Sequence, residues 1–366
     1  MKKILVLVGG SYISGAEKVT LDVLKGLRKK GYQLHCVVSG WNDGDFIERL
    51  NAMDIPYTTI KVGWLYTSNL RWTLDSLVHY PKGLFDFLRI KRKFKPDIVY
   101  TASFRQVALL YPFFSSNILY HVHDPNSNSR QSRFFMKKIA SKVVNYIAVS
   151  EFIKKDLLQC GLDIHKIKVV HNGIDILALP APATSAYFSI GIVGQIIQRK
   201  GHAIIVDALK LLHDQGAKIK LIIVGKGDAA YEQLLRTQVQ AYQLEQWVEW
   251  RGFVKDLYKI YEGIDVVMAP TQNEEPFGLM ASEANMFGKP AIVSNRGGLP
   301  EIIIDDVNGY TINDINNPKA FANAIMHLYN NRHLVSEMGS RGRQRVIDIF
   351  SIDKMNQSIH ELIEQL

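Results

Sequence analysis

Apolar runs of four to six residues alternate along the chain with longer stretches in which apolar residues recur every three or four positions. Short continuous runs are typical of strands buried on both faces, and periodic stretches such as residues 16–30 are typical of amphipathic helices. In the first half we expect strands at residues 4–8, 33–38, 97–100, 118–122 and 146–149. Strands separated by helices form right-handed βαβ units, so this half predicts a parallel sheet with helices on both faces.

The alternation pauses at residues 177–185, where small residues and prolines follow one another without periodicity, and a linker is predicted over 177–187. A second series of strands then follows, at residues 189–193, 220–224, 247–251, 266–269, 290–293 and 309–312. We therefore predict an α/β protein of two Rossmann-like, doubly wound parallel-sheet domains, residues 1–176 and 188–351. Ligands of such sheets bind at the carboxyl ends of the strands, so a cleft between the domains is the expected active site.

The composition fits this interpretation. A length of 366 residues suggests two domains, and 47% hydrophobic with 22% charged residues is ordinary for a soluble globular protein. The apolar run at residues 4–8 is too short for a signal peptide, and no run approaches the roughly 18 residues of a membrane span. Cys36 and Cys160 lie far apart and indicate neither a disulfide framework nor a zinc site, which favours a cytoplasmic location.

Charge is distributed unevenly along the chain. Residues 1–175 carry 26 Lys and Arg against 14 Asp and Glu, a net charge of +12, whereas the remainder carries −3. This asymmetry indicates an anionic partner for the first half: a membrane surface, a nucleic acid or an acidic substrate. A solvated basic face is the alternative. No nucleic-acid motif accompanies the charge, so no nucleic-acid partner is expected.

The strongest local motif is residues 271–284, directly after the strand predicted at 266–269. Glu275 precedes a Pro-Phe-Gly turn, and Glu283 follows after seven intervening residues, inside a helix expected to begin near Gly278 or Leu279. The unpaired amides and the positive dipole end of a helix start favour a phosphate group. The two carboxylates can accept hydrogen bonds from sugar and ribose hydroxyls. Alternatively, both are simply acids in a helix start.

This segment resembles the E-x(7)-E signature of the retaining GT-B glycosyltransferases, in particular of glycosyltransferase family 4. Other segments resemble this family in order and spacing across nearly the whole chain: residues 14–19, 121–124, 148–150, 171–175, 194–201 and 297–301. The resemblance implies a nucleotide diphosphate sugar bound mainly by the second domain, an acceptor bound by the first, and transfer without a cofactor or a metal. It also implies that the helix at residues 352–366 packs back on the first domain.

The resemblance also implies a role for individual residues at positions that match the family's motifs. Glu275 is similar to the residue that binds sugar hydroxyls, and Glu283 to the ribose ligand. Phe277, Gly278 and Leu279 resemble the turn whose amides meet the sugar and the diphosphate. Lys200 is similar to the family's diphosphate lysine, which supplies positive charge as the leaving group becomes more negative.

One position departs from the family pattern. An arginine often follows the glycine that corresponds to Gly194, and this chain has Gln195 there. Arg199 lies in the same loop and is the expected substitute. Without the resemblance, Arg199 and Lys200 are interpreted as a solvated pair of basic residues.

The remaining site residues are expected at the ends of other strands. His123 resembles the histidine that contacts the transferred sugar, and strand alternation favours it over His121; the alternative is a turn residue before Asp124. Gly15, near the start of the first helix, is expected to bring a backbone amide close to the donor phosphate, and Gly225, directly after a strand, is expected to approach the nucleotide; ordinary turns are the alternative. Phe253 and Val254 lie where the family places the base, with packing as the alternative.

Two other interpretations of the motifs are disfavoured. The glycines Gly9, Gly10 and Gly15 do not form G-x-G-x-x-G, which argues against a nicotinamide enzyme. Asp43 and Asp45 have the D-x-D spacing of metal-binding transferases, but they lie in a polar turn, and no metal site is expected. Three functions stay open beside sugar transfer: a nucleotide-sugar epimerase, a phosphorylase on the same fold, or a non-catalytic sugar-binding subunit.

The basic segments of the first half suggest where the acceptor is found. Residues 89–95 interleave five basic residues with Ile90 and Phe94, and residues 130–142 surround Phe134, Phe135 and Met136 with further basic residues. Basic and apolar residues together favour the headgroup zone of an anionic bilayer. We therefore expect a glycan or lipid-linked acceptor in bacterial surface-polysaccharide synthesis and peripheral association with the cytoplasmic face.

Overall fold

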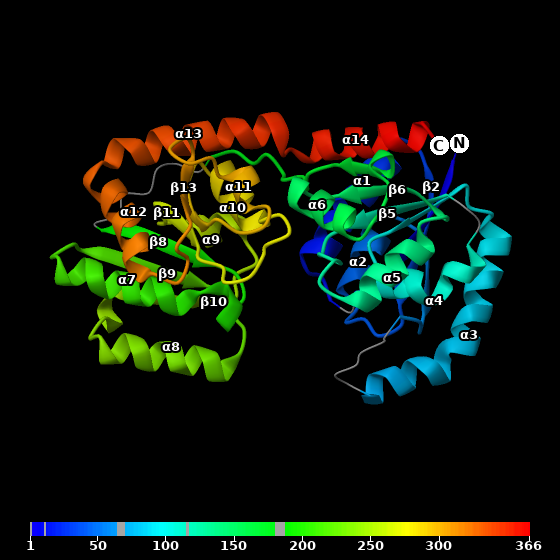
Figure 1. Ribbon diagram of the computed structural model, residues 1–366, viewed down its shortest axis with the longest axis horizontal. Coiled ribbons are helices and arrows are strands. Elements are labelled where there is room, and N and C mark those ends of the chain that lie inside the picture. The colour runs from blue at the N-terminus through cyan, green and yellow to red at the C-terminus, as the bar shows by residue number, and fades with distance from the viewer. Residues whose placement is uncertain (1, 11, 64–69, 115–116, 180–186) are drawn as a thin grey trace. The chain divides into compact units, whose positions relative to one another are not determined.

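The structure is a computed structural model that describes residues 2–10, 12–63, 70–114, 117–179 and 187–366 (Figure 1). The chain divides into two compact units, one of Met1–Gly173 with Ile352–Leu366 and the other of Ile174–Ser351. The division falls at Gly173, three residues before the domain end predicted at 176. Most of the linker predicted at 177–187, residues 180–186, lies outside the described residues.

The first unit is built on a seven-stranded parallel sheet in the order β3-β2-β1-β4-β5-β6-β7. Its strands are β1 (Lys3–Val8), β2 (Gln33–Ser39), β3 (Tyr57–Ile60), β4 (Ile98–Thr101), β5 (Ile118–Val122), β6 (Val143–Ala148) and β7 (Ile167–Val169). Its helices are α1 (Gly15–Lys29), α2 (Asp45–Ala52), α3 (Leu70–Phe94), α4 (Phe104–Leu110), α5 (Arg130–Ile139), α6 (Glu151–Gln159) and α14 (Ile352–Glu364), with 3-10 turns η1 (Tyr111–Phe113) and η2 (Ile164–Lys166).

The second unit is built on a six-stranded parallel sheet in the order β10-β9-β8-β11-β12-β13. Its strands are β8 (Phe188–Val193), β9 (Ile219–Val224), β10 (Val248–Gly252), β11 (Val266–Ala269), β12 (Ala291–Ser294) and β13 (Gly309–Ile312). Its helices are α7 (His202–Asp214), α8 (Ala229–Ala241), α9 (Leu257–Tyr261), α10 (Leu279–Met286), α11 (Leu299–Ile302), α12 (Pro318–Asn330) and α13 (Arg332–Ile349), with 3-10 turns η3 (Gln198–Lys200) and η4 (Glu245–Trp247).

The central strands of both sheets are apolar along their whole length. In β1, residues 4–8 are all buried, and in β9 only Lys220 is more than slightly exposed. Helices cover both faces of such strands: Figure 1 shows α7 and α8 on one side of the second sheet, with α10 and α13 on the other. The prediction of two Rossmann-like parallel-sheet domains is confirmed. The cleft expected between the domains stays a prediction.

The sequence analysis missed two strands, β3 and β7, which form the two edges of the first sheet. Both are short and half-exposed, so they lack the continuous apolar run by which the inner strands were predicted.

Helix α14 belongs to the first unit, where it lies against α1. Asn356 Nδ2 donates to the carbonyl oxygen of Asp22 at 3.2 Å, and Tyr32 Oη lies 2.7 Å from His360 Nδ1. A Cβ on Gly26 would come within 2.3 Å of Asn356 Cγ, so the small residue allows the two helices to approach. Among the described residues, no helix is long and apolar enough to cross a membrane.

Candidate functional site

The strand order of the second sheet reverses its direction between β8 and β11. In open α/β sheets, ligands bind outside the carboxyl ends of the strands at such a switch point. The loop after β8 carries Lys200, and the loop after β11 carries Glu275. The topology therefore brings these two predicted residues to the same edge of the sheet.

Lys200 and Glu275 form an ion pair with 2.7 Å between Nζ and Oε2. Their side chains are 27% and 21% exposed, so both are largely withdrawn from water while remaining reachable. The backbones of the two loops are bonded as well, because Gln272 N donates to the carbonyl oxygen of Arg199 at 2.8 Å. The side chain of Arg199 itself is exposed.

The approach of these loops depends on Gly201, the residue after Lys200. Its φ is +75°, a left-handed conformation that favours glycine, and a Cβ there would lie 1.9 Å from the carbonyl oxygen of Pro270. Any side chain at this position would push the two loops apart and separate Lys200 from Glu275.

The turn after Glu275 leads directly into α10. Gly278 caps the helix in a left-handed conformation, with a φ of +104°, and Leu279 is the first helical residue. The side chain of Phe277 is buried against Phe350, with ring centroids 5.8 Å apart, so only its backbone faces the loop. The first amides of a helix have no intrahelical partner and favour an anion, and the phosphate contact expected at this turn stays a prediction.

A glycine pair on a neighbouring loop supports the same turn. Gly298 N donates to the carbonyl oxygen of Glu275 at 2.7 Å. Gly297 has a φ of +60°, and a Cβ there would lie 2.1 Å from that same oxygen. The backbone of Glu275 is thus fixed independently of its side-chain ion pair.

Glu283 lies within α10 and is held by a tyrosine that the sequence analysis did not single out. Tyr261 Oη lies 3.2 Å from Glu283 Oε2 and 3.3 Å from the carbonyl oxygen of Met280. Burial and the neighbouring carboxylate raise the pKa of Tyr261 well above its ordinary value, so the phenol stays protonated and donates. Tyr261 lies 22 residues upstream in the chain, and no local motif links it to Glu283.

The loops after β8, β9 and β10 are joined edge to edge by backbone hydrogen bonds. Gly194 N donates to the carbonyl oxygen of Val224 at 2.9 Å, and Gly225 N donates to that of Gly252 at 2.8 Å. A Cβ on Gly225 would lie 1.8 Å from the carbonyl oxygen of Gly194, so the close packing requires glycine. Gln195 is exposed in the first of these loops.

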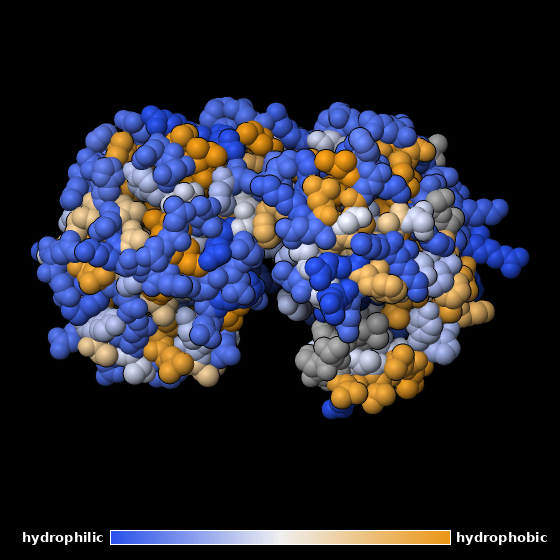
Figure 2. Space-filling view, in the orientation of Figure 1, coloured by the Kyte–Doolittle hydropathy of each residue, from blue (hydrophilic) through white to orange (hydrophobic). Residues whose placement is uncertain are grey.

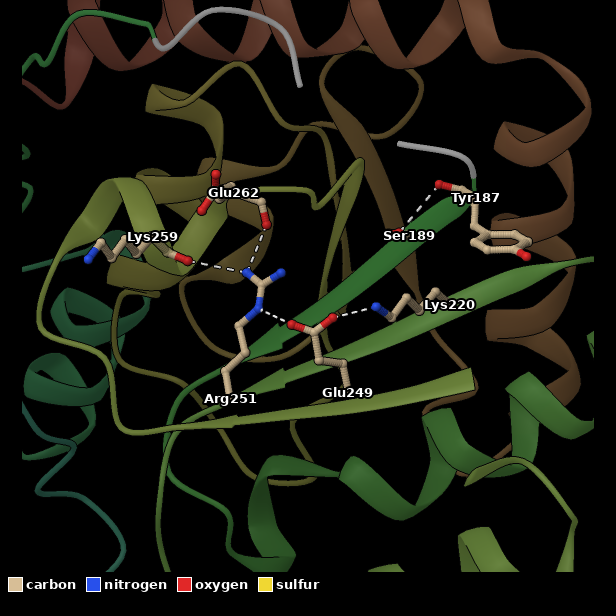
Figure 3. Close-up of polar contacts among 7 residues, drawn as sticks. All are labelled: Tyr187, Ser189, Lys220, Glu249, Arg251, Lys259 and Glu262. Carbon is tan, nitrogen blue, oxygen red and sulfur yellow. Dashed lines mark hydrogen bonds and ion pairs between the residues drawn. The ribbon is translucent and has the colours of Figure 1, made fainter. Parts of the chain in front are cut away.

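Phe253 and Val254 follow β10, and their loop is anchored by Arg251 (Figure 3). Arg251 Nη1 donates to the carbonyl oxygens of Glu262, at 2.8 Å, and Lys259, while its Nε donates to Glu249 Oε1 at 2.6 Å. These bonds tie the end of α9 to β10. Phe253 is 62% exposed there, which leaves its ring free to contact a ligand.

Glu249 is the centre of this anchor. It accepts hydrogen bonds from both Lys220 and Arg251, and these two cations hold its pKa below the ordinary value. The charge on Glu249 thus keeps Arg251 oriented toward the end of α9.

His202 lies beside the ion pair and was not predicted. It is fully buried, and neither ring nitrogen has a hydrogen-bond partner among the described residues. Burial, with the neighbouring Lys200, lowers the pKa of His202 to about 4, so the ring is neutral at neutral pH. A neutral ring at this position adds no positive charge to that of Lys200.

The first unit places Gly15 and His123 at the carboxyl ends of its own strands. Gly15 opens α1 after β1, where the backbone N and the hydroxyl of Ser14 both donate to Glu17 Oε2. His123 lies just past the end of β5, and the switch in strand order falls between β1 and β4. These two residues belong to the first unit, whereas Lys200 and Glu275 belong to the second.

The argument that preferred His123 over His121 is wrong in its geometry. Residues two apart in a strand point to the same face, and the two rings lie side by side with centroids 4.2 Å apart. The difference between them is depth: His121 is fully buried with its Nδ1 2.6 Å from Tyr100 Oη, whereas His123 is half-buried. Burial lowers the pKa of His123 to about 4 and keeps its ring neutral.

Asp43 and Asp45, which have the D-x-D spacing, lie in a turn, as predicted. Asp45 N donates to Asp43 Oδ1 at 3.2 Å at the start of α2, and Gly44 N donates to Asn42 Oδ1 at 3.0 Å. Within the part of the chain that the structure describes, no three His, Cys, Asp or Glu side chains are grouped to hold a metal ion.

Comparison with known proteins identifies the class. The fold matches that of solved GT-B glycosyltransferases: the structure of HepE from Anabaena in complex with UDP-glucose superposes with a TM-score of 0.83, at 22% identity over the whole of both chains. The family model "Glycosyltransferase Family 4" matches residues 13–176, and "Glycosyl transferases group 1" matches residues 183–345. The chain belongs to the group 1, family 4 glycosyltransferases, which confirms the family resemblance, while transfer with retention stays a prediction.

Curated relatives match over part of their length. The putative glycosyltransferase YtcC of Bacillus subtilis is 25% identical over 65% of this chain and 64% of its own. The putative colanic acid biosynthesis glycosyltransferase WcaL of Escherichia coli is 24% identical over 60% of this chain and 56% of its own. The chain thus spans less than two thirds of the length of these relatives.

Proposed function

We propose that this protein transfers a sugar from a nucleoside diphosphate sugar, in the first instance a UDP-sugar, to a hydroxyl of a glycan or lipid-linked acceptor. The observation that carries the proposal is the Lys200–Glu275 ion pair at the switch point of the second sheet, next to the start of α10. The presence of UDP-glucose in the structure of HepE supports this choice of donor.

The proposed chemistry follows from charge. Breaking the bond between sugar and diphosphate leaves extra negative charge on the leaving group, and a fixed ammonium lowers the energy of that state. Lys200 and the amides of Phe277, Gly278 and Leu279 would face the diphosphate, and Glu275 the sugar hydroxyls. Glu283 would accept hydrogen bonds from the ribose. The positive charge of Lys200 serves the purpose that a metal ion serves in metal-dependent transferases.

The remaining predicted residues complete the proposed site. Gly225, Phe253 and Val254 would line the nucleotide, while Gln195 and Arg199 occupy the loop where the family often has an arginine. His123 would contact the transferred sugar from the first unit, with Gly15 near the phosphate. We propose transfer with retention of the anomeric configuration, in which no side chain acts as nucleophile and alignment of donor and acceptor supplies much of the rate.

The name of the relative WcaL, a putative colanic acid biosynthesis glycosyltransferase, supports a role in polysaccharide synthesis. We further propose that the product is a surface polysaccharide and that transfer takes place at the cytoplasmic face of the membrane. The direct test begins with thermal shift of the full chain against UDP- and GDP-sugars, because a ligand of the folded state raises the melting temperature. The stabilising donor is then incubated with and without glycan or lipid-linked acceptors. Proton NMR of the product reads the anomeric configuration.

The outcomes separate the proposal from its rivals. A product that requires an acceptor and keeps the donor's anomeric configuration supports retaining transfer. An altered sugar nucleotide formed without acceptor would indicate an epimerase, and a sugar phosphate formed with inorganic phosphate would indicate a phosphorylase. Stabilisation by a donor with no product from any acceptor would favour a non-catalytic binding subunit.

A further inference from the structure

Helix α3 is packed on one face only. The packing face carries Ser76, Gly83 and Phe87, which are buried. A Cβ on Gly83 would come within 2.4 Å of Val62 Cγ2, and the ring of Phe87 lies 5.4 Å from that of Phe114. These contacts fix which side of the helix faces the unit and therefore which side faces away.

The outward face of α3 is apolar over most of its length. We call the following six residues the apolar stripe: Leu70, Leu74, Leu77, Val78, Phe85 and Leu88. Their spacing of 4, 7, 8, 15 and 18 residues from the first places them on one side of a helix with 3.6 residues per turn. Val78 is 76% exposed and Leu70 is 74% exposed, although both are large apolar side chains.

Figure 2 shows apolar residues gathered on the surface of the first unit over the beginning of α3. Scattered exposed leucines are ordinary, but a contiguous apolar patch on one helix face marks a surface that binds something. The helix also contains Pro81, which lacks a backbone N–H and favours a bend at that point.

A line of basic side chains runs beside the apolar stripe. Arg71, Lys82, Arg89 and Lys93, which we call the basic row, are all exposed. Their separations of 11, 7 and 4 residues keep them within about 40° of one another around the helix axis. Residues 70–95 hold seven Lys and Arg against two Asp, and one of these, Asp75, accepts a hydrogen bond from Trp41 Nε1 at 2.6 Å.

This arrangement corrects the interpretation of residues 89–95. Ile90 and Phe94 are half-buried, and the ring of Phe94 lies 5.6 Å from that of His35 on the body of the unit. Lys91 Nζ donates to the carbonyl oxygen of Phe113 at 2.6 Å, so this lysine is already engaged. The apolar residues that face outward come from the earlier part of α3, which the basic run did not identify.

Helix α5 is corrected in the same way. Met136 is buried, and the ring of Phe135 packs against that of Phe104 at 5.1 Å, while Phe134 is 69% exposed. Of the three apolar residues named there, only Phe134 faces solvent. The apolar stripe of α3 is thus the larger outward-facing apolar surface of the two.

We propose that α3 lies in the headgroup zone of an anionic bilayer, with the apolar stripe entering the acyl boundary and the basic row contacting lipid phosphates. An apolar face flanked by basic residues is the pattern of helices that lie in a membrane interface. A second copy of the chain in an antiparallel twofold contact would bring two basic rows together, and this repulsion favours the anionic bilayer as the occupant. The proposal does not depend on sugar transfer.

Vesicle flotation of the full chain tests the proposal. Vesicles of phosphatidylcholine with 30% phosphatidylglycerol are compared with pure phosphatidylcholine, at low and high salt. Binding is expected with the anionic vesicles and is expected to fall as salt rises. The triple-serine variant, which combines Leu74→Ser, Leu77→Ser and Val78→Ser, should lower binding about tenfold or more. The basic-row variant, in which Arg71, Lys82, Arg89 and Lys93 are all replaced by Gln, should lower binding to a similar extent.

Matched controls exist on exposed positions elsewhere. One control variant replaces four exposed lysines on other parts of the first unit by Gln and so removes the same charge: Lys25, Lys29, Lys155 and Lys168. The other control, Leu234→Ser, removes a similarly exposed leucine from α8. Both controls should float like the parent chain. A loss of binding in the charge control equal to that of the basic-row variant overturns the proposal, because total charge would then suffice.

Insertion is measured by a probe on the stripe itself. Cys36 and Cys160 are buried, so Val78→Cys offers an exposed thiol for an environment-sensitive fluorophore. Its emission should shift to the blue with anionic vesicles, while a label at Lys155→Cys should not respond. No flotation and no shift overturns the proposal. A concentration-dependent dimer in sedimentation without lipid, lost in the triple-serine variant, also overturns it and assigns the stripe to self-association.

Discussion

Lys200 Nζ lies 2.7 Å from Glu275 Oε2, although 75 residues separate them in the chain. The pair holds the lysine at the switch point of the sheet before any donor arrives. We predict that Lys200→Ala lowers kcat by roughly 100-fold, on the order of 3 kcal/mol, because a preorganised charge at the leaving diphosphate is lost. Initial rates with saturating donor and acceptor measure the effect.

Lys218→Ala provides the control, since Lys218 is an exposed lysine at the amino end of β9, whereas Lys200 and Glu275 follow the carboxyl ends of parallel strands. It should leave kcat unchanged. Lys200→Arg keeps the charge and should recover part of the rate. Parent-like turnover of Lys200→Ala would remove this residue from the site.

Glu283 is expected to act through donor affinity. We predict that Glu283→Gln raises KM for the donor about tenfold or more, because a charged hydrogen bond to the ribose contributes roughly 1.5–3 kcal/mol. Tyr261→Phe keeps the carboxylate but removes the hydroxyl that contacts it at 3.2 Å, so a smaller rise is expected. Donor titrations at saturating acceptor measure both. An unchanged donor KM in Glu283→Gln contradicts the assignment.

Chelation separates charge supplied by Lys200 from charge supplied by a metal. We predict that transfer continues at its full rate after dialysis against EDTA, with product formation measured before and after. Loss of activity that Mg²⁺ restores would show that the transfer needs a divalent ion. Asp43→Asn with Asp45→Asn would then ask whether that ion sits at the D-x-D turn.

Acid should destabilise the fold through its buried histidines. The pKa of His202 is lowered to about 4 in the folded chain. Below about pH 6.5 the imidazole is therefore protonated in the unfolded chain but stays neutral in the folded chain until the pH approaches 4. Stability from the neutral ring is therefore full above about pH 6.5 and is lost as the pH falls toward 4. Each pH unit in this window lowers the free energy of unfolding by at most about 1.4 kcal/mol per histidine.

Chemical denaturation between about pH 7 and pH 5 measures this dependence. His202→Leu should weaken it by the share of one histidine, while His123 continues to contribute because its pKa is also about 4. The same slope in His202→Leu and the parent chain would contradict the prediction.

The sequence predicted what depends on local apolar pattern. Every strand of the second sheet was expected within about one residue of its observed bounds. For β8, β9, β11 and β12 the reason is that buried parallel strands are continuous apolar runs, whereas the edge strands β10 and β13 are partly exposed and were located by their place in the alternation of strands and helices. The edge strands β3 and β7 were missed, since half of their side chains face water. The start of α10 was expected at Gly278 or Leu279, where the glycine signals the end of the turn.

The residues that support the site could not be predicted in the same way. Tyr261 reaches Glu283 only because α9 and α10 are neighbours in space, and a single sequence carries no sign of that. His202 is an ordinary polar residue at the start of a helix pattern, and only packing shows that both of its nitrogens are buried. The alternation rule misled at His121 and His123 because it was applied to residues two apart, which share a face.

Helix α14 belongs to the first unit, yet it is separated from the rest of that unit by residues 174–351. A ribosome adding roughly 5 to 20 residues per second needs about 10 to 35 s to synthesise that stretch. During this time the first sheet exists without the helix that packs on α1. The surface that later contacts Asn356 and His360, which includes Asp22 and Tyr32, stays exposed to water and to chaperones. The second unit can fold completely before the first one closes.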